Sequence, residues 1–249
     1  MSNVAPRIGF MGPPEFALPT LERLASHYPL VGVVTQPDRP AGRGRRVVAS
    51  PVKEFALAEG IPIFQPERLR RVEAVERIRA WAPDLIVVAA YGQILRPSVL
   101  EIPRLGVLNV HASLLPRWRG AAPVQAAILA GDTVTGVTIM KMNEGMDTGP
   151  VVAKREVPIV PGETGGELET RLAEIGAELL VVQERGAEGA IVLVLHLRED
   201  LLEIREHFLG VALRLRQVIG QLDVFRLDER DQPHVELHLL VEGLGLALD

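Results

Sequence analysis

A regular alternation of short apolar runs with amphipathic segments constrains the fold of this chain more than any other feature. Residues 84–92 are almost continuously apolar, and residues 30–35 share this character, which is typical of strands buried on both faces of a parallel sheet. Segments with helical spacing of apolar residues separate such runs between residues 7 and 183. The alternation predicts an α/β fold with a doubly wound, mostly parallel, Rossmann-like sheet and right-handed crossovers.

The same patterns predict the individual elements and the domain limits. A domain is expected over residues 1–184, followed by a short atypical C-terminal tail over residues 185–249, where the composition changes. One helix should begin after Ser50 as its N-cap, with Pro51 in the first position, and should end at Gly60. The other expected strands are 7–12, 61–64, 107–111, 135–142 and 151–157, and the other helices are 18–25, 67–81, 121–131 and 166–183.

The stretch of residues 106–123 carries the most informative polar side chains. Strand geometry from residue 107 places Asn109 and His111 on one face, roughly 7 Å apart along the strand. An amide and an imidazole at the C-terminal end of a strand lie where open α/β sheets form their active sites. Taken alone, the pair also fits a polar strand end with a satisfied core histidine.

Two other site types are disfavoured by the sequence. Gly9 and Gly12 do not form G-x-G-x-x-G, and two prolines follow them, so a dinucleotide site is not expected. His234, Glu236 and His238 alternate along a possible strand and could share a face, but such alternation is more typical of the wet face of an edge strand. No metal site is therefore predicted.

Residues 36–46 form the most basic stretch of the chain. Arg39, Arg43, Arg45 and Arg46 fall within eight residues, interleaved with proline and glycine, so this segment cannot be a helix. One interpretation of this stretch is a solvated loop. The other is an extended loop whose guanidinium groups bind phosphates through paired hydrogen bonds. The net charge of −5 argues against general attraction to nucleic acid, so a polyanion would have to be held by this local patch.

Composition narrows the function classes further. No run of about 18 apolar residues occurs, so no transmembrane helix or membrane partner is expected. The first seven residues lack the features of a signal peptide, and we expect a cytoplasmic monomer. Cysteine is absent, which excludes disulfides, thiolate metal ligands and cysteine nucleophiles.

Several motifs together resemble those of methionyl-tRNA formyltransferases, a branch of the 10-formyltetrahydrofolate-dependent formyltransferases. The resemblance covers about residues 7–180. The arginine-rich stretch and the Pro-Arg-Trp-Arg-Gly-Ala-Ala-Pro segment point to the tRNA-directed branch. The matching segments are 10–17, 34–44, 50–53, 90–95, 109–123 and 146–149.

The resemblance implies a formyltransferase fold and a reaction. A formyl group moves from N10 of 10-formyltetrahydrofolate, the co-substrate, to the α-amino group of methionine on initiator tRNA, for translation initiation. The catalytic residues of the family match Asn109, His111 and Asp147, although Asp147 alone, in a glycine-flanked loop, reads as a turn former. Arg39, Arg43, Arg45 and Arg46 would bind the tRNA, with Arg43 the main contact. The implied folate-binding residues are Ala90, Tyr91, Gly92, Ser113, Leu114, Leu115, Pro116, Glu144 and Gly145.

Two alternatives remain open on the sequence. The family normally carries a C-terminal barrel of the oligonucleotide-binding type, and residues 185–249 show no match to it. The chain could therefore formylate a small amine such as an amino-sugar nucleotide. It could also be a non-catalytic folate- or RNA-binding homologue with a defective tail, although a binder has no need of Asn109, His111 and Asp147 together.

Overall fold

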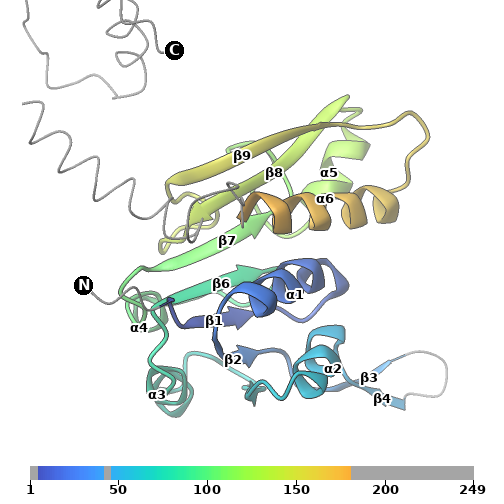
Figure 1. The fold of residues 1–249 in the computed structure, drawn as a ribbon. Coiled ribbons are helices and arrows are strands. Elements are labelled where there is room, and N and C mark those ends of the chain that lie inside the picture. Colours follow the sequence, from blue (N-terminus) through green and yellow to red (C-terminus); the bar gives the residue numbers. More distant parts are fainter. Residues whose placement is uncertain (1–4, 42–45, 181–249) are drawn as a thin grey trace, which may run out of the picture. The chain divides into compact units, whose positions relative to one another are not determined.

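The structure is a computed structural model that describes residues 5–41 and 46–180. Its described part contains a seven-stranded sheet in the order β5-β2-β1-β6-β7-β8-β9 (Figure 1). The first five strands in this order are parallel, and β8 and β9 are antiparallel to their neighbours, so the prediction of a mostly parallel sheet is confirmed. The strands are β1 (Ile8–Met11), β2 (Leu30–Val34), β5 (Ile63–Phe64), β6 (Leu85–Ala89), β7 (Val107–His111), β8 (Val134–Lys141) and β9 (Val151–Pro158).

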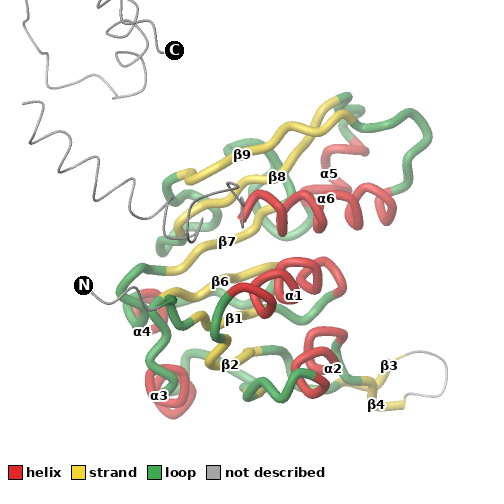
Figure 2. The backbone as a smooth tube through the Cα atoms, in the orientation of Figure 1, coloured by secondary structure: helices red, strands yellow, loops and turns green. Residues whose placement is uncertain are grey.

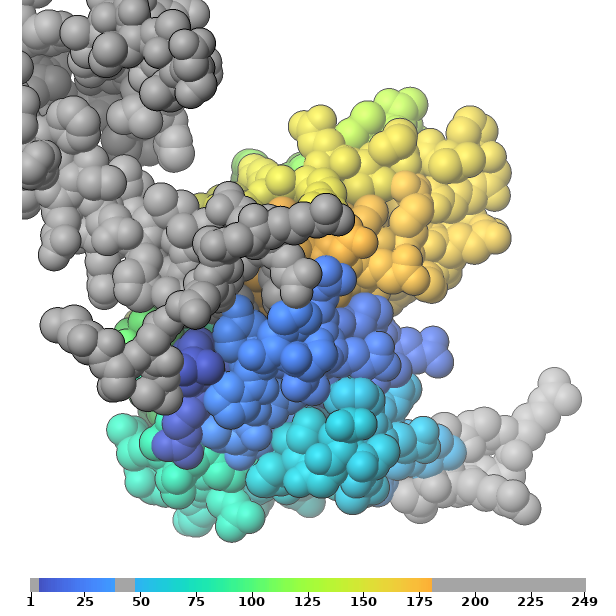
Figure 3. All heavy atoms as spheres, in the orientation of Figure 1, coloured from blue at the N-terminus to red at the C-terminus, as the bar shows by residue number. Residues whose placement is uncertain are grey.

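Helices cover both faces of the sheet (Figure 2). On one face, α1 and α6 lie side by side, as the blue and orange surfaces in Figure 3 show, and residues of α2 and α5 join the same core. On the other face, α3 and α4 pack on the strands. The helices are α1 (Leu18–His27), α2 (Pro51–Ala58), α3 (Val72–Ala80), α4 (Pro97–Leu100), α5 (Pro123–Leu129) and α6 (Gly165–Leu180), and the short 3₁₀ helix η1 (Glu15–Ala17) precedes α1.

The alternation of side chains along each strand explains the two cores. Phe10 of β1 and Val87 of β6 point into the first core, whereas Met11 and Val88, one residue further along, point into the second. Because both faces are covered, these strands need apolar residues at every position, which is the continuous apolar run seen in the sequence.

The predicted start of the helix is confirmed for α2 and wrong for α3. The Ser50 hydroxyl accepts from the amide of Lys53 at 3.2 Å and Pro51 begins the helix, as predicted. The helix expected over residues 67–81 begins only at Val72, which is 70% exposed rather than part of an apolar face. The end of this helix is anchored by Trp81, whose indole occupies the space that the missing side chain of Gly32 leaves on β2.

The arginine-rich stretch, expected as a loop, contains a small two-stranded hairpin. β3 (Arg39–Ala41) pairs antiparallel with β4 (Arg46–Val48), and the two strands extend beyond α2 at one end of the sheet (Figure 1). Arg39 and Arg46 thus lie on paired strands, while Arg43 and Arg45 lie outside the described residues. The predicted domain boundary at residue 184, the tail 185–249 and the His234, Glu236 and His238 set also lie outside them.

Candidate active site

Strand β7 presents Asn109 and His111 at its carboxyl end, on the same face, as the sequence predicts. On this face Val107 packs in the core that α3 and α4 cover, but the two polar residues lie beyond it and line a cavity. Asn109 is only 9% exposed and His111 only 6%. The parallel strand β6 beside β7 contributes Val88 to the same cavity, so the site lies where open α/β sheets bind ligands.

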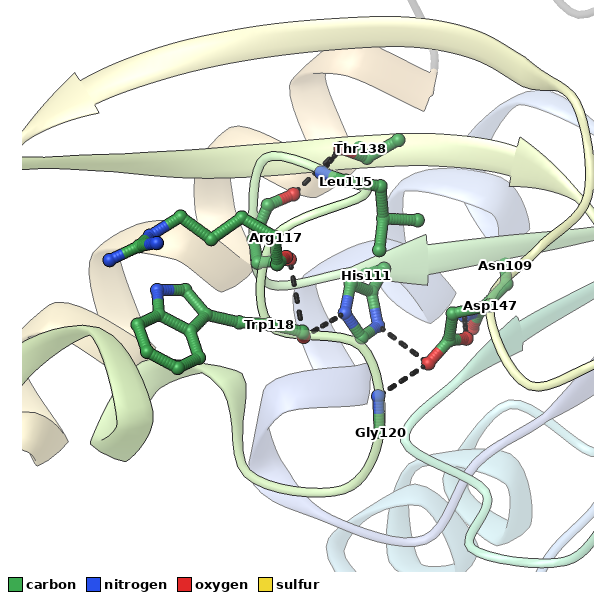
Figure 4. Close-up of polar contacts among 9 residues, drawn as sticks. Asn109, His111, Leu115, Arg117, Trp118, Gly120, Thr138 and Asp147 are labelled. Carbon is green, nitrogen blue, oxygen red and sulfur yellow. Dashed lines mark hydrogen bonds and ion pairs between the residues drawn. The ribbon is translucent and has the colours of Figure 1, made fainter. Parts of the chain in front are cut away.

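Asp147 reaches this pair from the loop between β8 and β9 (Figure 4). Its Oδ2 accepts a hydrogen bond from the amide of Gly120 at 2.8 Å and lies 3.7 Å from His111 Nδ1. Its Oδ1 accepts a longer bond, 3.4 Å, from Asn109 Nδ2. The carboxylate therefore connects the amide, the imidazole and the loop of Gly120 in one polar cluster.

The hydrogen bond of His111 to the backbone defines which ring nitrogen carries a proton. Nε2 lies 3.0 Å from the carbonyl oxygen of Trp118, which can only accept, so Nε2 is the donor (Figure 4). In the neutral ring, Nδ1 is then unprotonated and faces the Asp147 side of the site. A proton arriving at Nδ1 would lie between the imidazole and the Asp147 carboxylate, which suits a group that gains and loses charge during a reaction.

The loop that supplies the Trp118 carbonyl is held by its own side chains. Arg117 makes two hydrogen bonds to Asp132, at 2.9 and 2.7 Å, and Trp118 Nε1 donates to the same carboxylate at 2.7 Å. The Arg117 guanidinium also lies 4.3 Å from the centre of the Trp118 ring. Hydrogen bonds, first from Arg117 and then from Trp118, lower the pKa of Asp132, so this clamp stays charged at neutral pH.

The other end of this loop is attached to β8 by a buried threonine. Thr138 Oγ1 donates to the Ser113 carbonyl at 2.6 Å and accepts from the Leu115 amide at 3.1 Å. Both ends of the segment behind His111 are thus fixed, one by Thr138 and one by Asp132. This arrangement positions the carbonyl that orients the imidazole.

We expect Thr138→Val to lower the free energy of unfolding by about 2–4 kcal/mol, because it leaves a buried amide and a buried carbonyl without partners. Thr135, also buried on β8, is the matched control, since its hydroxyl has no hydrogen-bond partner in the described structure. Thr135→Val should be neutral or slightly stabilising. Urea unfolding of the two variants measures the difference, and equal losses would contradict the role of Thr138.

Backbone strain is concentrated at the site. Four non-glycine residues of the described chain have positive φ: Ala90 (+49°) and Asp147 (+49°) line the cavity, and Trp118 (+58°) supplies the carbonyl that bonds to His111. Each such residue costs on the order of 1–3 kcal/mol and persists only when its surroundings hold it. Three of the four strained residues thus belong to the site.

The cavity has a volume of about 400 Å³ and a mostly apolar wall. This size lies within the range of small-molecule sites, about 300–1,000 Å³. Asn109, His111 and Asp147, whose polar atoms lie together in Figure 4, are part of its lining. The hydrogen-bond donors can stabilise an oxyanion, and the carboxylate beside them can accept a proton. These are the two functions that acyl or formyl transfer to an amine requires.

The sequence profile of the family described as "Formyl transferase" matches residues 17–183. The chain belongs to this formyl transferase family. It is 60% identical over 184 residues to a methionyl-tRNA formyltransferase of Symbiobacterium thermophilum, and 61% identical over 180 residues to one of Halorhodospira halophila. These matches cover 74% and 72% of this chain but 56% and 57% of the relatives, so the chain spans little more than half of their length.

Solved structures support the fold assignment. The phosphoribosylglycinamide formyltransferase of Streptococcus pneumoniae superposes with a TM-score of 0.59, covering 70% of this chain and 93% of its own, at 24% identity. A glycinamide ribonucleotide transformylase from Geobacillus kaustophilus gives 0.58 at 29% identity, over 70% and 94% of the two chains. The predicted formyltransferase fold is confirmed.

Eight of the twelve predicted catalytic and folate-binding residues of this formyl transferase line one cavity. Ala90, Tyr91, Gly92, Glu144 and Gly145 line the same cavity as the three polar residues. The other four implied folate residues, Ser113, Leu114, Leu115 and Pro116, are not part of its lining; their loop packs behind His111, where Ser113 and Leu115 bond to β8. Their contact with folate stays a prediction.

Sequence reasoning missed three groups that the site uses. The Trp118 carbonyl and the Gly120 amide are backbone atoms, which residue types do not report. Thr138 pairs with His111 across β7 and β8, and only its place on the expected strand 135–142 could have indicated it.

Among the described residues, a search for membrane-spanning helices finds none of sufficient length and hydropathy. A search of the same residues for three or more histidine or acidic side chains placed to bind a metal ion also finds none.

Proposed function

We propose that this formyl transferase moves the formyl group of 10-formyltetrahydrofolate to the α-amino group of methionyl initiator tRNA. The observation that carries the proposal is the convergence of Asn109, His111 and Asp147 on one cavity. The relatives named as methionyl-tRNA formyltransferases support the choice of acceptor. We further propose that it acts in the cytoplasm as a monomer and needs no metal.

The proposed reaction proceeds through a tetrahedral intermediate. The amine nitrogen attacks the formyl carbon and the carbonyl electron pair moves to oxygen. The pair then re-forms the carbonyl as the bond from the formyl carbon to N10 breaks, and N10 takes up the proton that the amine lost, which gives tetrahydrofolate. Asn109 Nδ2 and a protonated His111 Nδ1 are the donors available for the oxyanion. Asp147 is the acceptor for the proton that the amine loses, directly or through a water.

We assign the folate to the cavity and the tRNA to the hairpin. The apolar wall with backbone groups at Ala90–Gly92 suits a flat heterocycle, and the volume suits a small-molecule site. Arg39, Arg43, Arg45 and Arg46 would pair with phosphates of the tRNA. The paired strands β3 and β4, which carry Arg39 and Arg46, extend from the end of the sheet beyond α2 (Figure 1).

One assay tests this assignment against its alternatives. Purified full-length chain is incubated with 10-formyltetrahydrofolate and either methionyl initiator tRNA or a panel of amino-sugar nucleotides. Formylmethionyl product is expected only with the tRNA. Formylation of an amino sugar instead, or folate binding with no transfer to any acceptor, would contradict the proposal.

We expect Arg43→Ala to raise the Kd for initiator tRNA and to lower the slope of log K against log salt by about one, because one phosphate contact is lost. The Kd for tetrahydrofolate should not change. Arg77→Ala, which removes an exposed arginine of α3, is the control for net charge and should leave the slope unchanged. Equal salt slopes for wild type and Arg43→Ala would remove the role of Arg43.

A further inference from the structure

A chain of hydrogen bonds runs from the base of the arginine hairpin to the wall of the cavity. Gln36, which lies between β2 and β3, donates from Nε2 to the carbonyl oxygen of Tyr91 at 3.1 Å. Tyr91 and Gly92 form part of the cavity wall, and Gly92 has a φ of +77°. A Cβ added at Gly92 would lie 3.2 Å from Gln36 Nε2, so the amide lies directly against this turn.

Gln36 is itself held by groups that fix the start of the hairpin. The side-chain amide of Gln65 donates at 2.7 Å to the Gln36 carbonyl and at 2.7 Å to Asp38 Oδ1. Asp38, the last residue before β3, also pairs with Lys53 of α2. The hydrogen bonds from Lys53 and then Gln65 lower the pKa of Asp38. The start of β3 and the cavity wall are therefore attached to one another through Gln36.

Resting on the function proposed above, we propose that Gln36 is a positioning residue that couples ligand binding in the cavity to tRNA binding at the hairpin. The Tyr91 carbonyl can only accept, so this contact depends on the NH₂ of Gln36. A ligand that contacts Tyr91 and Gly92 restricts the motion of this turn and, through the hydrogen bond to Gln36, the motion of residues 36–38. A tRNA bound at the hairpin restricts the motion of the same residues 36–38 from the hairpin side.

Two ligands that order the same residues bind with positive cooperativity. The first ligand already restricts these residues, so the second binds without a further loss of their conformational entropy. The coupling is reciprocal, so either affinity reports it. Gln36 touches neither ligand in this proposal; it acts through the wall and the hairpin base. If Gln36 only stabilised the fold, its substitution would weaken the binding of both ligands. It would not change the ratio of the Kd of tetrahydrofolate measured without tRNA to the Kd measured with tRNA.

The test measures the Kd of tetrahydrofolate, which carries no formyl group to transfer, by calorimetry with and without saturating methionyl initiator tRNA. In the wild-type chain the tRNA is expected to tighten tetrahydrofolate binding about fivefold or more. In Gln36→Glu, which removes the donor but keeps the size, the ratio should fall to about one, as it should in the uncharged Gln36→Met.

Thr170→Glu is the charge control. Thr170 is exposed on α6, is not part of the cavity lining, and its hydroxyl bonds to the Gly166 carbonyl one turn earlier. The substitution adds the same charge as Gln36→Glu and should keep the wild-type ratio. A wild-type ratio near one, or one that survives both Gln36 substitutions, overturns the coupling alone. Wild-type chain that binds neither ligand overturns the proposed function and, with it, this inference.

Discussion

Asp147→Asn is expected to lower kcat for formyl transfer by about 10³-fold, within the range that a positioned general base contributes. The carboxylate accepts from Gly120 and Asn109 and lies 3.7 Å from His111. An asparagine has one accepting oxygen, so its NH₂ must face either the Gly120 amide or the Asn109 amide, both of which are donors. The substitution thus removes the proton acceptor and the negative charge beside the imidazole together.

Two measurements separate a chemical defect from a folding defect. The Kd for tetrahydrofolate should stay close to that of the wild type, and the free energy of unfolding should fall by only about 0.5–1.5 kcal/mol, the cost of one lost hydrogen bond, so that the variant stays folded while single-turnover formylation slows. Asp84→Asn, a change of the same kind near the opposite ends of the strands, should leave kcat unchanged, because the Asp84 carboxylate bonds to Arg7 and Arg104 and is not part of the cavity lining. An Asp147→Asn enzyme within tenfold of the wild-type kcat would exclude Asp147 as the proton acceptor.

The parts of the site that lie on strands could be predicted from sequence. Side chains alternate along a strand, so Asn109 and His111 had to share a face, and the carboxyl end of β7 had to lie near that of β6. Asp147 could be assigned only through the resemblance to the formyltransferase family. It lies on a loop 36 residues after His111, and its distance from His111 depends on the path of the chain through β8 and the loop before β9.

The parts that depend on backbone atoms or on loop paths could not be predicted. Nothing in the type of residue 118 shows that its carbonyl, rather than its indole, orients His111. The contact of Gln36 with Tyr91 joins residues 55 positions apart and depends on a left-handed turn at Gly92. Periodicity alone extended the predicted helix to residue 67, whereas α3 begins at Val72; the Leu69 amide bonds to the side chain of Gln93, a tertiary contact that periodicity does not report.

His111→Ala is expected to lower kcat by about 10²–10³-fold, the usual loss when an oxyanion donor is removed. Gln is the second substitution to test, since its NH₂ can keep the bond to the Trp118 carbonyl while the group at Nδ1 is lost. If the bond to Trp118 serves only to aim Nδ1, His111→Gln should be as slow as His111→Ala and should unfold at a higher urea concentration.

The double variant His111→Ala with Asp147→Asn gives the sharpest test of the cluster. Because a proton on Nδ1 would lie against the carboxylate, we expect the two residues to act as one unit. The double variant should then be no slower than the slower single variant, rather than slower by the product of the two losses. A multiplicative loss, measured by single-turnover formylation, would mean that the Asp147 carboxylate does not support a proton on His111 Nδ1 and that the two residues contribute independently.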